Sequence, residues 1–311
     1  MTQQKAALGI DIGGTNTAFG WVETDGRIRM QGTMPTRGYA DPAAYVQALW
    51  EAIARMPGFQ AAELRGIGVG APSANVHRGT IEYAPNMEWQ GVIPIGALIA
   101  GVSGLPVRVT NDANAAAMGE MIYGAAKGMR DFIMVTLGTG VGSGFVVNGE
   151  LLYGHDGFAG ELGHVIAVRD GRPCGCGRNG CLEAYASATG IVRTAVEKLS
   201  ASEQASILRN HSGIQARDLF EAAEQGDALA KEVFAETGRI LGQTLADAVA
   251  ITSPEAIILF GGLARAGEHI FAPVRQAMEA NLLNLYQGKV NLLHSQLPES
   301  DAAILGAAAL V

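Results

Sequence analysis

The residue types best suited to metal chemistry are concentrated between residues 161 and 183. All three cysteines of the 311-residue chain lie in this stretch, and a histidine precedes the first of them by ten residues. Three thiolates and one imidazole complete the tetrahedral ligand set of Zn²⁺, and a set with no open position is typical of structural rather than catalytic zinc. The interspersed glycines allow the backbone to bend tightly enough to bring the sulfurs together. The sequence therefore predicts a zinc site formed by His164, Cys174, Cys176 and Cys181.

A disulfide is the alternative use of these cysteines. An odd number of cysteines leaves one thiol unpaired, and the Cys-x-Cys spacing of Cys174 and Cys176 is short for a bridge. Zinc therefore fits the pattern better than a disulfide does.

Two carboxylates bracket the predicted zinc site. Glu161 shares a short segment with His164, and Glu183 follows the last cysteine by two residues. An imidazole that gives one nitrogen to zinc can donate a hydrogen bond from the other, and the metal fixes the orientation of the ring. Neighbouring carboxylates can accept hydrogen bonds from hydroxyl groups, so the three side chains together suit a polyol. The alternative is that both carboxylates are solvated loop charges.

The stretches that must position such a ligand include two similar hairpins. The first begins with an apolar strand over 6–12, turns at GGT (13–15), continues as a strand to residue 23 and, after an Asp-Gly turn, forms a third strand over 27–33. Residues 131–153 repeat this order, with GTG at 138–140 and an Asn-Gly turn at 148–149. We interpret the repeat as one supersecondary unit used at the head of each half of the chain.

Both hairpins are suited to binding phosphate. Glycine lets backbone N–H groups approach an anion closely, and a threonine hydroxyl adds a donor. Two such turns in matching positions favour a phosphate chain held from both sides of a cleft. The pattern is not a Walker A loop, because no Gly-Lys-Ser/Thr follows. The candidate residues are Gly13, Gly14, Thr15, Gly138, Thr139 and Gly140.

Asp112 is the candidate catalytic base. It follows a predicted strand over 107–110 and opens an alanine-rich helix that runs to about residue 123. Ligands of open α/β sheets gather at such strand ends. The alternative is a helix cap, which Asn111, Asp112 or Asn114 could each provide. The two phosphate hairpins favour the functional interpretation.

The rest of the chain alternates predicted helices and strands. We expect helices over 41–56, 94–102, 227–251, 267–285 and 301–310, strands over 65–70, 256–260 and 290–293, a loop over 73–91, and a polar break at 200–213 within the mainly helical region 183–253. Gly261-Gly262, between a strand and a helix, suits close approach by a nucleotide, although helix packing would also explain it. The halves are expected to meet at a helical hinge near 113–127.

Composition bounds the class of protein. A chain of 311 residues with 48% hydrophobic content is long enough for about two domains. No apolar run reaches the ~18 residues of a membrane span, and we expect no signal peptide, because a strand pattern begins almost at once. A formal net charge of −8 disfavours nucleic acid or an anionic membrane as partner. Reduced cysteines in a metal pattern indicate the cytoplasm.

Several motifs together resemble the ROK family of bacterial sugar kinases over essentially the whole chain. The matching runs are, in order, DIGGT at 11–15, TNDANAAA at 110–117, LGTGVGSG at 137–144, GELGH at 160–164 and the cysteine pattern ending in CLE at 174–183. Their number and common order make the resemblance specific. The run CLEAYASATG at 181–190 is most similar to the glucokinases of that family.

The resemblance implies an actin-like (ribonuclease H-like) α/β fold, in which two domains close over a cleft and each is built on a mixed five-stranded sheet. It implies an N-terminal domain of about residues 1–118, joined by the final helix near 300–311, and a C-terminal domain of about residues 119–299. ATP would lie deep in the cleft across the two phosphate hairpins, with a hexose beside it.

The resemblance also implies roles for individual residues. Asp112 would take the proton from the sugar 6-hydroxyl, and Asp11 would orient Mg²⁺ through water. The hexose pocket would be lined by Gly70, Ala71, Asn86, Asn111, Asp112, Glu161, His164 and Glu183. The phosphates would lie against Gly13 to Thr15 and Gly138 to Gly140, with Gly261 and Gly262 facing the nucleoside. His164 would join Cys174, Cys176 and Cys181 on structural Zn²⁺.

The implied activity is ATP-dependent phosphorylation of a hexose, with glucose as the first expectation and a homodimer as the expected assembly. Mannose, allose, fructose, N-acetylglucosamine and N-acetylmannosamine are alternative substrates, and polyphosphate is an alternative donor. A rival of another class is a sugar-sensing regulator of the same family, which would carry a DNA-binding helix-turn-helix ahead of this body. The run GIDIGGT begins at Gly9 and the net charge is −8, so we expect a kinase.

Overall fold

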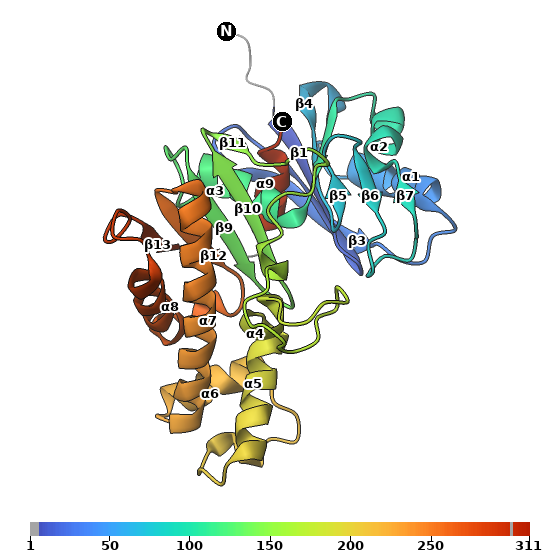
Figure 1. Cartoon of the computed structure of the whole chain (residues 1–311). Helices are drawn as coiled ribbons and strands as arrows, with labels where there is room; N and C mark the ends of the chain where they lie inside the picture. The colour runs from blue at the N-terminus through green and yellow to red at the C-terminus, as the bar shows by residue number, and fades with distance from the viewer. Residues whose placement is uncertain (1–5, 299–300) are drawn as a thin grey trace.

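The computed structural model describes residues 6–298 and 301–311, whose strands form two mixed sheets of five strands each and one small sheet. The two large sheets lie in separate halves of the molecule, with helices α3 (Asp112–Tyr123) and α9 (Ala302–Ala308) between them (Figure 1). Among the described residues, no helix is long and apolar enough to cross a membrane.

The first large sheet has the strand order β3-β2-β1-β4-β8. Strands β1 to β3 form an antiparallel meander, and β4 and then β8 add in parallel on the other side of β1. The run AALGIDI places β1 inside the sheet, because an almost wholly apolar strand needs cover on both faces. The bounds are β1 Ala6–Ile12, β2 Asn16–Val22, β3 Ile28–Pro35, β4 Leu64–Gly70 and β8 Val107–Thr110.

The second large sheet repeats this arrangement, with the order β11-β10-β9-β12-β13. Its first three strands again form an antiparallel meander, and β12 and β13 again add in parallel. The predicted duplication of one supersecondary unit is therefore confirmed. The bounds are β9 Phe132–Leu137, β10 Val141–Val147, β11 Glu150–Leu151, β12 Ala256–Phe260 and β13 Asn291–His294.

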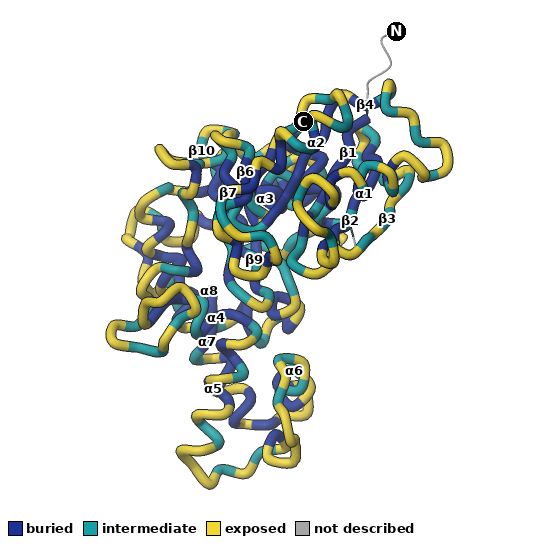
Figure 2. Tube along the Cα trace, turned by 90° about the vertical axis from the view of Figure 1, so that its right-hand side faces the viewer, coloured by how far each residue is buried: buried dark blue, intermediate teal, exposed yellow. Residues whose placement is uncertain are grey.

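Several helices begin at capping residues. Asp41 caps α1 by accepting a hydrogen bond from the amide of Ala44, and Asp227 caps α7 in the same way through Ala230. Figure 2 shows α3 buried at the centre of the molecule, whereas the projecting lobe around α5 and α6 has exposed loops. The remaining helices are α1 Pro42–Ala54, α2 Ile95–Ser103, α4 Glu183–Ala186, α5 Ala188–Ala201, α6 Ala216–Glu224, α7 Ala228–Thr252 and α8 Glu268–Asn281, with short 3₁₀ turns at Ala61–Glu63, Leu162–His164, Ile207–Asn210 and Ala264–Ala266.

Two sequence expectations were wrong. Residues 73–91 are not simply a loop, because they contain β5 (Ala74–Asn75) and β6 (Thr80–Glu82), which form a small sheet with the following β7 (Val92–Ile93). Strands of two or three residues show no periodicity that a sequence pattern could reveal. Helix α8 ends at Asn281 rather than near residue 285, because the chain turns extended at Leu282, whose side chain is buried.

Glycines allow α9 to lie directly on the first sheet. A side chain at Gly9 would overlap the backbone oxygen of Ile304, and one at Gly68 would overlap that of Ala307. Gly306 makes a similarly close approach to Ala115 of α3. The chain therefore returns to the first half at its C-terminal end through contacts that admit no β-carbon.

We expect the Gly68→Ala variant to lose about 1–3 kcal/mol of unfolding free energy in urea titrations, because its β-carbon would force α9 off the sheet. Gly101→Ala is the matched control, since Gly101 lies in α2 with open space around it. That control should lose no stability and should gain up to about 1 kcal/mol, because alanine is favoured over glycine inside a helix. Equal stability of the two variants would contradict the proposed tight contact.

Candidate functional site

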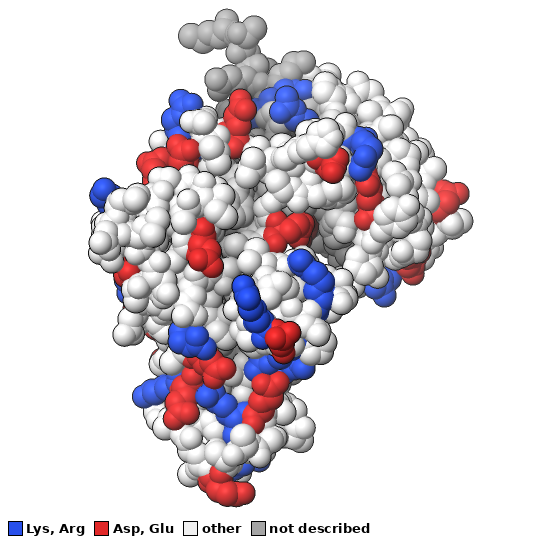
Figure 3. All heavy atoms as spheres, viewed as in Figure 1, with Lys and Arg blue, Asp and Glu red and all other residues white. Residues whose placement is uncertain are grey.

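A cleft of about 790 Å³ opens between the two halves, where strands of both large sheets end. Acidic side chains are visible in the hollow between the halves (Figure 3). Strands β8, β9 and β12 all point their C-terminal ends into it, as expected for ligand sites of α/β sheets. The predicted site residues that line this cleft are Asn86, Asn111, Asp112, Gly138, Thr139, Gly140, Glu161, His164, Cys176, Glu183 and Gly261.

A second cavity of about 380 Å³ adjoins the cleft. Its own lining includes Asp11, Gly13 and Gly14 of the first hairpin. The residues common to both cavities are Pro72, Asn86, Asp112, Thr136 and Phe260. Asp112 therefore stands on the wall between a space lined by polar side chains and a space lined by the first glycine turn.

Six predicted site residues do not line either cavity: Thr15, Gly70, Ala71, Cys174, Cys181 and Gly262. Gly70 and Ala71 are buried behind the wall, and a β-carbon at Gly70 would lie 3.6 Å from Oδ1 of Asp11 and 3.8 Å from Cα of Asp112. Gly70 thus provides room for the two carboxylates and offers no group of its own. Thr15 and Gly262 are exposed beside their turns.

The N-terminus of α3 shows why Asp112 is free for chemistry. Asn111 is the helix cap, and its Oδ1 accepts a hydrogen bond of 2.7 Å from the amide of Asn114. Asp112 is the first residue of the helix, and its Oδ1 accepts a hydrogen bond of 2.8 Å from the adjacent amide of Ala113. The alternatives for the cap are therefore resolved in favour of Asn111.

Two carboxylates share the smaller cavity, and each resists ionisation. Burial raises the pKa of Asp112, and the hydrogen bond from Ala113 opposes this rise. Solvent still reaches Asp112 through the open cleft. Burial, and then the negative charge of Asp112, raise the pKa of Asp11 to about 7. Two close carboxylates in a partly buried space favour a bound cation, which would stabilise both negative charges.

Each glycine hairpin has backbone amides that are free to bind a ligand. The amide of Gly13 donates to the carbonyl of Asn16, and the amide of Gly138 donates to that of Gly140, so both are used in closing the turn. The remaining amides, which have no protein acceptor within the described part of the chain, are those of Gly14, Thr15, Thr139 and Gly140. These groups are available to an anion.

The four predicted metal ligands converge. The chain has no disulfide among its cysteines, and the candidate ligand atoms of His164, Cys174, Cys176 and Cys181 lie within 4.8 Å of one another. Nδ1 of His164 is 3.7 Å from Sγ of Cys174, and the sulfurs of Cys176 and Cys181 are 3.5 Å apart. Three sulfurs and one imidazole nitrogen at these separations are a donor set that could bind zinc.

Glu183 connects this cluster to the second hairpin. Its Oε2 accepts a hydrogen bond of 3.0 Å from the amide of Val141, and its Oε1 lies 3.8 Å from Sγ of Cys174. Glu161 also lines the cleft. Its pKa is raised chiefly by burial. The charge of His164 lowers this pKa, and the negative charges of Asp112 and Glu183 raise it. The carboxylates of Glu161 and Glu183 and the imidazole of His164 thus face one polar space.

Sequence reasoning missed three residues of the site. Thr136 lines both cavities and its hydroxyl accepts from the amide of Gly142 at 3.1 Å, while Phe260 forms part of the shared wall. Arg37 donates to the carbonyl of Gly14 at 2.8 Å and to that of Asn86 at 3.5 Å. Arg37 lies more than twenty residues beyond the glycine turn that it contacts, and no motif in the sequence marks it.

Several known proteins are similar to this chain in sequence and in fold. Residues 7–311 match the profile of the ROK family. A glucokinase of Halalkalibacterium halodurans is 36% identical over 312 residues, covering 98% of this chain and 94% of that protein. An N-acetylmannosamine kinase of Citrobacter koseri is 34% identical over 308 residues, covering 98% of each.

The crystal structure of a ROK family glucokinase from Streptomyces griseus in complex with glucose and AMPPNP has a TM-score of 0.80 to this chain and 36% sequence identity. It covers 98% of this chain, which covers 99% of it. The two mixed five-stranded sheets are those of the actin-like fold, so the predicted fold class is confirmed.

The raised pKa of Asp11 predicts a pH dependence of stability. A carboxyl that binds its proton more tightly in the folded chain stabilises the fold at low pH, and this contribution is lost as pH rises from about 4 through about 7. In magnesium-free buffer, the unfolding free energy of Asp11→Asn relative to wild type should therefore increase over this pH range. The matched control is Asp25→Asn in an exposed turn. Parallel pH profiles of unfolding free energy for wild type and Asp11→Asn would contradict the raised pKa of Asp11.

Proposed function

This chain belongs to the ROK family, and we propose that it is an ATP-dependent hexose kinase that transfers phosphate to the 6-hydroxyl of glucose. The observation that carries the proposal is the place of Asp112 on the wall shared by two adjoining cavities. One cavity presents groups that can read sugar hydroxyls, and the other presents a glycine turn suited to phosphate. A base at their junction is where a hydroxyl would meet a phosphoryl group.

Asp112 is the general base of this reaction. Its carboxylate accepts the proton of the sugar 6-hydroxyl, and its raised pKa makes it a stronger base than an ordinary aspartate. The hydroxyl oxygen then attacks the terminal phosphorus of ATP, the bond from that phosphorus to the bridging oxygen breaks, and ADP leaves. Phosphoryl transfer depends mainly on such positioning and on neutralised charge.

The phosphate chain of ATP lies between the two hairpins. The amides of Gly14, Thr15, Thr139 and Gly140 are free to donate to its oxygens, and Gly261 and Gly262 leave room for the nucleoside. Asp11 would orient Mg²⁺ through water, since its raised pKa beside the negative charge of Asp112 favours a nearby cation. When bound, Mg²⁺ supplies positive charge to the phosphate oxygens.

The sugar is read by the groups facing the larger cleft. Its hydroxyls can hydrogen-bond to Asn86, Asn111, Glu161, His164 and Glu183, and a zinc ion held by His164 and the cysteines would fix the orientation of the imidazole. Glucose is the first candidate because the glucokinase relative and the glucose-bound neighbour are each 36% identical to this chain. N-acetylmannosamine is the alternative that the second relative favours.

The two halves act as domains that close over the substrates and exclude water. The boundaries we propose are 1–118 with 300–311 for the N-terminal domain and 119–299 for the C-terminal domain. The docking of α9 on β1 and β4 supports the assignment of the last helix to the N-terminal domain.

A homodimer is the assembly we propose. An apolar groove of about 260 Å³ runs beside α7 and is lined in part by Phe145, Leu152, Leu162, Val165 and Ile251. The side chain of Ile251 is 84% exposed, which is unusual for an isoleucine in an ordered helix and typical of an interface.

The activity is tested with a panel of hexoses, ATP and Mg²⁺, using an assay that couples ADP release to NADH oxidation. We expect the highest kcat/KM for glucose. Asp112→Asn should lower kcat by at least ~10²-fold, the lower limit for loss of a general base, while its circular dichroism stays that of the folded protein. Near-normal turnover in that variant would remove Asp112 from its role, and a higher kcat/KM for an N-acetylhexosamine would replace glucose as the substrate.

Loss of one zinc ligand should affect the sugar more than the nucleotide. Cys176→Ser is expected to release the metal, loosen the loop that carries His164 and Glu183, and raise KM for glucose more than KM for ATP. Metal analysis and steady-state kinetics check this, with Asp112→Asn as a control that keeps its zinc. Purified wild-type protein without zinc would end the metal assignment.

The dimer is tested by light scattering after size exclusion. Ile251→Glu should shift the protein toward the monomer, because a buried charge at the interface is costly. Val196→Glu, at an exposed apolar position on α5, is the control and should leave the mass unchanged. A wild-type protein with the mass of one chain would refute the proposed dimer.

A further inference from the structure

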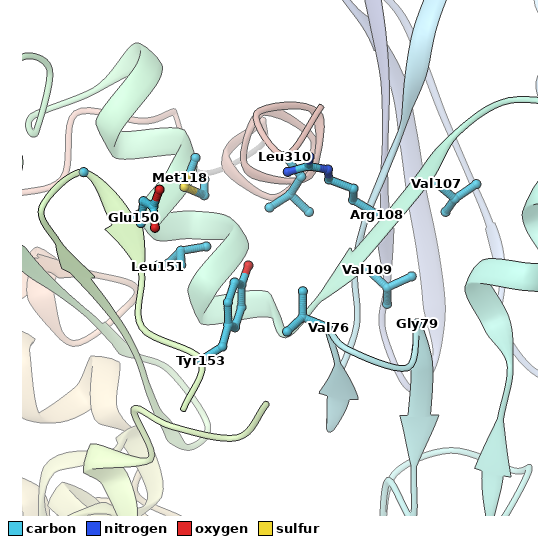
Figure 4. A pocket seen from close by; sticks show the side chains of 11 residues that line it. Val76, Gly79, Val107, Arg108, Val109, Met118, Glu150, Leu151, Tyr153 and Leu310 are labelled. Atoms are coloured by element: carbon cyan, nitrogen blue, oxygen red, sulfur yellow. The ribbon is translucent and has the colours of Figure 1, made fainter. Parts of the chain in front are cut away.

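A cavity of about 510 Å³ lies between the two halves and shares no lining residue with the catalytic cleft or its adjoining cavity. Its walls come from the edge strands of the two large sheets, β8 on one side and β11 on the other. Met118 of α3 and Leu310 near the end of the chain complete it (Figure 4). The space is within the range of about 300–1,000 Å³ typical of small-molecule sites.

Polar groups from both halves face this space. Figure 4 shows the guanidinium of Arg108, the carboxylate of Glu150 and the phenol of Tyr153 around the cavity, with apolar side chains between them. Arg108 and Glu150 are both exposed, and neither has an ion-pair partner among the residues that the structure describes. A positive and a negative charge therefore stand on opposite walls, each available to a ligand.

A buried hydroxyl lies beside the cavity, at the end of strand β8. The side chain of Thr110 is buried near the phenol of Tyr153. The pKa of Tyr153 is raised by burial and lowered by Thr110 and by Arg108. Strand β8 lines the cavity and leads through Thr110 and Asn111 into α3, the helix that carries the proposed base.

We propose that this cavity binds a small hydroxylated oxyanion, the chemistry shared by sugar phosphates and sugar acids. Arg108 and Tyr153 donate to the phosphate or carboxylate, since a guanidinium fork and a phenol match such an anion. Glu150 accepts hydrogen bonds from hydroxyl groups at the other end of the ligand. The negative charge of Glu150 disfavours a bare anion, which offers it no donor.

A ligand held by β8 and β11 at once would set the relative position of the two halves. They are already tied beside the cavity, where Nδ2 of the buried Asn75 donates to the carbonyl of Asp156 at 2.7 Å and His77 donates to that of Gly154 at 3.1 Å. Filling the cavity adds a second tie and slows the opening and closing of the cleft. The expected effect is a lower kcat with an unchanged KM for glucose. This effect rests on the proposed kinase activity, whereas binding does not.

The test is calorimetric titration with glucose 6-phosphate, gluconate and inorganic phosphate as separate ligands. The protein is first saturated with glucose and AMPPNP, so that the catalytic cleft is closed to them, and each titration is repeated without these two. At least one hydroxylated ligand should bind with a Kd below ~1 mM, and Arg108→Gln should weaken it by at least ~10-fold. Arg217→Gln, an exposed arginine on α6, is the control and should bind normally.

Three results would overturn the proposal. The first is that the wild-type protein binds neither glucose 6-phosphate nor gluconate. The second is that wild type and Arg108→Gln bind these ligands equally well. The third is that the wild-type protein, with Glu150 intact, binds inorganic phosphate as tightly as glucose 6-phosphate. Which of the two hydroxylated ligands binds identifies the source of the oxyanion. A protein that binds no glucose or AMPPNP would fail as a kinase, while the titration would still report on this cavity.

Discussion

The proximity of two carboxylates, Asp11 and Asp112, in one partly buried cavity is the constraint to which the rest of the site responds. Burial makes each negative charge costly, and the charge of one raises the pKa of the other. The surroundings offset this cost with the N-terminus of α3, with free amides of the glycine hairpins and with space for a cation. A site that stabilises concentrated negative charge is one that can accept a phosphate chain.

The duplicated sheets explain where this site lies. Because each half uses the same strand order, the same turn follows the first strand of each meander, and the two turns can face one cleft. Helix α3 starts at the cleft with Asp112 and runs between the halves, while α9 lies on glycines that leave no gap beneath it. The proposed base is thereby anchored to the part of the molecule about which the halves would move.

Glu183 connects the cysteine cluster to the second glycine hairpin. Glu183 contacts Cys174 through one oxygen and binds the amide of Val141, next to the second hairpin, through the other. A metal that orders the cysteine loop would therefore also fix the strand that follows the second glycine turn. The carboxylate of Glu183 also lines the cleft, so one side chain joins the cysteine cluster, the second hairpin and the polar space between the halves.

The local sequence determined the elements whose formation depends on neighbours in the chain. Apolar strands, glycine turns and the cysteine pattern are visible in a few adjacent residues, which is why the duplicated hairpins, the fold class and the convergence of His164 with the cysteines could be predicted. Only the tertiary structure decided which of Asn111, Asp112 and Asn114 caps α3. It also showed that Arg37 and Thr136 join the site. Finally, it showed that strands within residues 73–91 take part in a small sheet. These features depend on contacts between residues far apart in the chain, and burial, which sets the pKa of Asp11, exists only once both halves enclose the cavity.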